Sequence, residues 1–163
     1  MQISLLADID GDCVPELIVP VFSEIVSETS KNKILIIDSK SGQTKLKINT
    51  PYHHLFEGDI AIADIDYDGV PEIFLKCGIS TQYPPNINGK LICYNLDNSI
   101  KWISDQQFEH SFSNPVSGKL GLADFNHDGI AEIYINNKIF NAQTGIQLAD
   151  GGLNGLGSGI TKK

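Results

Sequence analysis

The stretch Asp64-Ile65-Asp66-Tyr67-Asp68-Gly69-Val70-Pro71-Glu72 decides the fold prediction for this chain. It has three carboxylates at alternate positions, then a glycine, then a glutamate at the ninth position, a pattern poorly suited to a buried strand. Ca²⁺ takes about six to eight oxygen ligands, and a tight loop with inward carboxylates, one backbone carbonyl and a distal acid supplies most of them. The stretch therefore predicts a calcium-binding loop.

The same pattern occurs twice more, in residues 8–16 and 124–132. The three copies recur at intervals of about 60 residues, which is the mark of a repeat protein. A solvated acidic turn is the alternative for any single copy, since Asp and Gly are common turn formers. An EF-hand needs its glutamate at about position twelve and a helix on each side, and neither is present.

Each acidic loop lies between two segments rich in β-branched residues, and two further strand segments follow it. The strands are expected at 3–7, 17–22, 33–38 and 44–48, at 59–63, 73–77, 90–95 and 100–103, and at 119–123, 133–136, 138–141 and 146–148. No segment shows a helical period with capping residues. The predicted class is all-β, with about three four-stranded antiparallel sheets arranged as β-propeller blades, either a partial propeller or a segment of a larger one.

The expected organisation is three blade-like repeats, at 1–50, 51–104 and 105–150, followed by a glycine-rich linker or the start of a further blade at 151–163. Such blades cannot bury both sheet faces alone. The expected partners are therefore further blades in the same chain or other copies in a homo-oligomer. Trp102 is expected to pack between blades rather than to stack on a sugar.

The three loops, with Ala7, Ala63 and Ala123 before them and strand residues after each glutamate, resemble FG-GAP/VCBS-type repeats, the calcium-binding blades of integrin-α-like propellers. The resemblance covers nearly all of residues 2–150. It implies a propeller in which the metal loop joins the first two strands of a blade, with up to three structural Ca²⁺ ions. The ligands it implies are Asp8, Asp10, Asp12, Val14 (carbonyl), Glu16, Asp64, Asp66, Asp68, Val70 (carbonyl), Glu72, Asp124, Asn126, Asp128, Ile130 (carbonyl) and Glu132.

Two loops depart from the common pattern. Cys13 stands where the other loops have Gly69 and Gly129, at a position expected to need a positive φ, and Gly11 is expected to absorb part of the strain. Asn126 replaces a carboxylate in the third loop, so one charge is lost there and calcium should bind more weakly.

Eleven of the twenty acidic residues lie in the three loops, so the net charge of −8 mostly describes metal sites rather than a partner. All basic residues are lysines without a basic stripe, which argues against nucleic acid. No apolar run is long enough for membrane insertion. Cys77 and Cys93 are expected as buried thiols, with a bridge between them as the alternative.

No nucleophile elbow, phosphate-cradling loop or paired catalytic His is present, so the chain is predicted not to be an enzyme. The predicted function is a calcium-binding segment of a secreted or cell-surface protein in adhesion or in glycan or protein binding. The alternatives are a non-catalytic part of a propeller-based carbohydrate-active enzyme such as a polysaccharide lyase, and a self-assembling ring. The loop at 83–85 is a candidate partner contact, and His53 and His54 are expected to be linker surface.

Overall fold

The computed structural model describes residues 4–21, 32–50, 60–77, 89–108 and 119–151. Within these ranges the chain is all-β and contains no helix. The predicted contact loop at 83–85, the histidine pair and the tail at 152–163 lie outside the described residues.

Twelve strands form three four-stranded antiparallel sheets, each with its strands in chain order. All twelve were predicted, in the right order and within a few residues of their ends. The repeat boundaries at 50, 104 and 150 stay predictions. The strands are β1 (Leu5–Ala7), β2 (Glu16–Val21), β3 (Asn32–Asp38), β4 (Thr44–Thr50), β5 (Ile60–Ala63), β6 (Glu72–Lys76), β7 (Leu91–Tyr94), β8 (Ile100–Ile103), β9 (Gly121–Ala123), β10 (Glu132–Ile135), β11 (Lys138–Asn141) and β12 (Gln147–Asp150).

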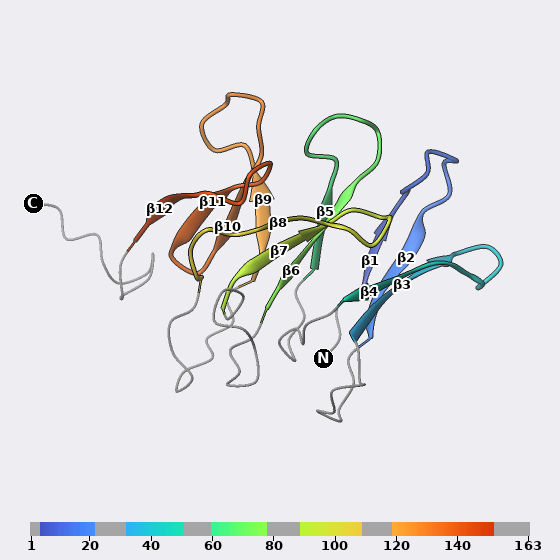
Figure 1. Ribbon diagram of the computed structural model, residues 1–163. Coiled ribbons are helices and arrows are strands. Elements are labelled where there is room, and N and C mark those ends of the chain that lie inside the picture. The colour runs from blue at the N-terminus through green and yellow to red at the C-terminus, as the bar shows by residue number, and fades with distance from the viewer. Residues whose placement is uncertain (1–3, 22–31, 51–59, 78–88, 109–118, 152–163) are drawn as a thin grey trace, which may run out of the picture.

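The second sheet is the middle layer of the three (Figure 1). Successive residues of a strand point to opposite faces of a sheet, so β6 divides its side chains between two neighbours. Ile73 and Leu75 pack with the first sheet, while Phe74 packs with the third. This is why every residue of β6 and β7 is buried.

The interface between the second and third sheets is centred on Trp102 of β8. Its side chain is 9% exposed and its ring lies 5.8 Å from that of Phe74. Its indole Nε1–H donates to the carbonyl of Ala142 in the third sheet at 3.0 Å. The prediction that Trp102 packs between sheets is confirmed.

The two buried cysteines are free thiols, as the first alternative predicted. Both lie in apolar surroundings of the second sheet. Burial raises the pKa of Cys77 to about 12. Burial, with a smaller contribution from the charge of Glu72, also raises the pKa of Cys93. Both thiols are therefore packing residues rather than nucleophiles.

Candidate metal centres

The three acidic loops connect the first two strands of each sheet and project from the same end of the molecule (Figure 1). The second and third loops also touch, since the Tyr67 hydroxyl of the second loop donates to the Gly129 carbonyl of the third. This contact is not predictable from the motif, because Tyr67 occupies a variable loop position. The loops therefore form a row rather than three isolated turns.

The first aspartate of each loop organises the backbone by accepting hydrogen bonds from N–H groups three to five residues ahead. Such bonds from Asp to nearby backbone groups are typical of tight turns. They run to Asp8 from Gly11 (2.8 Å) and Cys13 (2.9 Å), to Asp64 from Asp68 (3.2 Å) and Gly69 (2.9 Å), and to Asp124 from Asp128 (3.2 Å) and Gly129 (3.0 Å).

The third acidic position of each loop serves a similar local role. Asp12, Asp68 and Asp128 each accept a hydrogen bond from the N–H two residues ahead, at 2.8, 2.7 and 2.8 Å. The donors are Val14, Val70 and Ile130, the residues whose carbonyls the family resemblance implies as ligands. Ligation by those carbonyls stays a prediction.

The backbone takes positive φ at two positions of every loop. The first such position holds Gly11, Tyr67 and His127, and the second holds Cys13, Gly69 and Gly129. Cys13 itself adopts φ 64°, so Gly11 does not relieve it of the left-handed conformation. That part of the sequence-based expectation is wrong, because both positions of the turn need positive φ.

Replacing Cys13 with glycine is expected to raise the free energy of unfolding by about 1 kcal/mol, because the left-handed region costs an L-residue about 1–2 kcal/mol. Urea unfolding of C13G measures the change. C13A keeps the strained backbone and removes only the thiol, so it serves as the control. A C13G protein less stable than C13A would contradict this account.

The glutamate at the ninth position is buried at the start of the second strand of each sheet. Glu16, Glu72 and Glu132 are 0%, 4% and 2% exposed. One oxygen of each accepts a hydrogen bond from the N–H that follows the first aspartate, namely from Ile9 (3.0 Å), Ile65 (3.1 Å) and Phe125 (2.8 Å). Each glutamate thus ties its loop to the sheet and keeps its second oxygen for another partner.

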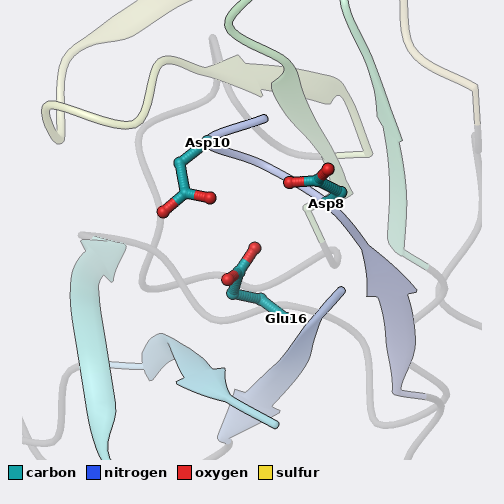
Figure 2. A group of neighbouring side chains, drawn as sticks. All are labelled: Asp8, Asp10 and Glu16. Atoms are coloured by element: carbon teal, nitrogen blue, oxygen red, sulfur yellow. The ribbon is translucent and has the colours of Figure 1, made fainter. Parts of the chain in front are cut away.

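Three carboxylates converge in every loop, and one oxygen atom from each lies within 4.8 Å of the other two. Figure 2 shows this for the first loop, where the side chains of Asp8, Asp10 and Glu16 point toward a common space. An all-oxygen, anionic donor set of this kind fits a hard divalent cation such as Ca²⁺. The three groups are Asp8, Asp10 and Glu16; Asp64, Asp66 and Glu72; and Asp124, Asp128 and Glu132.

The remaining predicted side-chain ligands are placed differently. Asp12 and Asp68 belong to their loops but not to the convergent groups. Asn126 uses its Oδ1 to accept from the Asp128 N–H at 2.9 Å and its Nδ2 to donate to the Asp128 Oδ2 at 2.9 Å. Its amide therefore orients Asp128 within the third loop.

Two lysines that are not part of the loop motif lie against the first two clusters. Lys45 Nζ is 2.7 Å from Asp10 Oδ2 and 2.6 Å from Glu16 Oε1. Lys101 Nζ is 2.5 Å from both Asp66 Oδ2 and Glu72 Oε1. Both lysines follow their glutamate by 29 residues, and this spacing shared by the first two repeats is the signal in the sequence that could have found them.

These contacts perturb the titration of the groups involved. Hydrogen bonding to Asp10 and Glu16 raises the pKa of Lys45, and hydrogen bonding to Lys45 lowers the pKa of Asp10. Burial opposes the charge on Lys101, but hydrogen bonds to Asp66 and Glu72 outweigh it and raise its pKa. Both lysines are therefore cations in the folded protein.

Fold and loops together define an all-β protein of repeated four-stranded sheets, whose three acidic clusters are able to hold metal ions. No protein-family model matches the chain, and no curated protein is significantly similar to it. The residues that the structure describes form no helix that could span a membrane.

Two solved structures share the fold. The biofilm matrix protein Bap1 of V. cholerae superposes with a TM-score of 0.57 at 22% identity, over 90% of this chain and 19% of that protein. The rhamnogalacturonan lyase YesW superposes with a TM-score of 0.61 at 16% identity, over 93% of this chain and 31% of that protein. The chain thus spans less than a third of either protein.

Proposed function

We propose that this chain is a calcium-stabilised β-propeller segment of the FG-GAP/VCBS type, from a secreted or cell-surface protein that acts in adhesion or in glycan or protein binding. The observation that carries the proposal is the row of three acidic loops at one end of the sheets, each with a convergent trio of carboxylates. Bound Ca²⁺ would neutralise carboxylates that the fold forces together and would fix each loop to its sheet.

The role outside the metal loops is supported by the kinds of protein that share the fold. One is a biofilm matrix protein and the other a polysaccharide lyase, so the adhesion role and the alternative of a carbohydrate-active enzyme each have one structural neighbour. In either case we propose that this segment is non-catalytic, because carboxylates committed to a cation do not also serve as general acid and base.

Further blades are proposed as partners because the outer face of the third sheet carries an exposed aromatic pair. Ile18 and Phe74, which lie two residues after their loop glutamates, are fully buried, but the equivalent Tyr134 is 39% exposed. Tyr134 also packs edge-on against Phe125, which is 50% exposed, with ring centroids 5.6 Å apart. An exposed aromatic pair at positions buried in the other sheets suits a covering sheet.

A covering sheet could come from another copy of this chain or from a further blade of the same protein. Light scattering of the 17.8 kDa chain distinguishes these two sources. A discrete multiple of this mass, dissociated by the F125S/Y134S variant, is expected if copies close a ring. A monomeric chain supports further blades from the same protein. An oligomer that F125S/Y134S leaves intact would contradict the role assigned to this face.

Removal of calcium is expected to lower the melting temperature. A site saturated about 100-fold above its Kd adds about 2.7 kcal/mol to folding, and for a chain of this size each 1 kcal/mol shifts Tm by about 2–4 °C. A melt in millimolar Ca²⁺ should therefore exceed one in EGTA by about 5–10 °C, with Mg²⁺ as the control cation. An equal midpoint in Ca²⁺ and EGTA would sink the proposed calcium role.

Ligand class is tested separately with a glycan array and with a polysaccharide incubation followed by ultraviolet absorbance. Calcium-dependent retention of a glycan, without formation of an unsaturated product, is the expected result. Formation of unsaturated product by this chain alone would overturn its assignment as non-catalytic.

A further inference from the structure

The fourth strand of every sheet carries one extra residue opposite the third strand. The pairing register shifts between Ile36 and Ile37, between Cys93 and Tyr94, and between Ile139 and Phe140. A bulge of this kind leaves one residue unpaired and re-aims its side chain. The residues skipped by the register are Lys45, Lys101 and Leu148.

The residue type at the bulge correlates with the residue type at the second acidic position of the loop. Where it is lysine, its ammonium bridges the second loop aspartate and the buried glutamate, as Lys45 does for Asp10 and Glu16. Where it is Leu148, the second acidic position of the loop is Asn126. The third repeat thus lacks both members of the lysine–aspartate pair.

The electrostatic surroundings of Glu132 therefore differ from those of Glu16 and Glu72. All three carboxylates are buried, and all three use one oxygen on a backbone N–H. In the part of the chain that the structure describes, a lysine pairs with the other oxygen of Glu16 and of Glu72, but none pairs with Glu132. A buried carboxylate without a paired cation is costly.

We propose that the third loop is the obligate calcium site, and that Lys45 and Lys101 act as built-in counter-ions which weaken calcium binding at the first two loops. The proposal rests on the proposed calcium function and adds an order of affinity to it. Among the residues that the structure describes, no lysine pairs with Asp124, Asp128 or Glu132, whereas at the other loops calcium must displace or repel an ammonium group. This order is the reverse of the one that Asn126 alone predicts.

Calorimetric titration of the full chain with CaCl₂, and melting in EGTA, test the proposal with reciprocal variants. L148K and N126D/L148K place the lysine of the other repeats in the third sheet. Leu148 is 53% exposed, so the change is compatible with folding. K45L/K101L removes both resident cations, and K47L, an exposed lysine on β4, is the control.

The expected wild-type result is one tight site with weaker additional binding. L148K should weaken the tight site by about tenfold or more and raise the melting temperature in EGTA, because the added ammonium replaces the ion. K45L/K101L should tighten the weak sites by a similar factor, while K47L binds as wild type.

Three equal sites, or a tight site unaffected by L148K, would overturn the proposed order while leaving the calcium function intact. Loss of the tight site in D8N or D64N rather than in D124N would do the same. If the titration with CaCl₂ shows no heat of binding and the melting temperatures in Ca²⁺ and EGTA are equal, the calcium function and this inference are both overturned.

Discussion

Replacing Trp102 with alanine is expected to lower the free energy of unfolding by about 3–5 kcal/mol, the cost of removing a large buried aromatic side chain. The ring fills the space between the second and third sheets. A Cβ added to Gly145 would come within 2.6 Å of it, so the third sheet is fitted closely to this side chain. The variant also loses the hydrogen bond to the Ala142 carbonyl. Urea unfolding of W102A measures the loss.

W102F is the matched control, because it keeps most of the apolar area and removes the N–H donor. Its loss should be smaller, about 1–2 kcal/mol, from the Ala142 carbonyl left without its donor. A loss below about 1 kcal/mol for W102A itself would contradict an inter-sheet role and would return Trp102 to the alternative of a sugar-stacking surface.

Replacing Lys101 with leucine is expected to destabilise the protein by about 2 kcal/mol when calcium is chelated. Breaking a fully buried ion pair from one side costs about 3–5 kcal/mol, and the 23% exposure of the Lys101 side chain reduces this figure. The loss arises because Glu72 stays buried without a counter-ion. Urea unfolding in EGTA measures it, and millimolar Ca²⁺ should restore much of the stability.

The double variant E72Q/K101L separates the charge effect from the loss of lysine packing. It should be more stable in EGTA than K101L, since no buried unpaired carboxylate remains and Asp66, whose side chain is 41% exposed, stays solvated. K47L should match the wild type. An unfolding free energy for K101L in EGTA equal to or above that of the wild type would exclude the counter-ion role. Restoration by Ca²⁺ in E72Q/K101L as large as in K101L would show that Glu72 is not the group being neutralised.

The fold was largely predictable because its determinants are local. Alternating or β-branched segments of four to seven residues specify strands, and acidic turns with glycine mark where the first strand of each sheet ends. The strands β10 and β11 meet at the two-residue turn Asn136-Asn137, where Asn136 adopts φ 54°. The three copies of the acidic loop together indicate a repeat protein, whereas a single copy is equally compatible with a solvated turn.

The sequence located the acidic loops, but it did not show which partner each acidic side chain contacts. Asp12 and Asp68 were predicted as ligands together with Asp8 and Asp64, because spacing along the chain does not reveal which carboxylates converge. The glutamate's bond to the backbone N–H seven residues earlier depends on loop closure. The strained φ of Cys13 likewise follows from the turn as a whole.

The sequence by itself determined the strand order, the three repeats, the position of the acidic loops and the all-oxygen chemistry that they offer. Tertiary structure alone decided which residues on the fourth strand face those loops. A single-residue bulge sets that outcome, and it depends on the pairing of two strands rather than on the composition of either. The different roles of Lys45, Lys101 and Leu148 therefore follow from the folded sheets and not from the sequence alone. The energy of a buried carboxylate depends on the charges near it, and the lysines that pair with Glu16 and Glu72 lie 29 residues further along the chain.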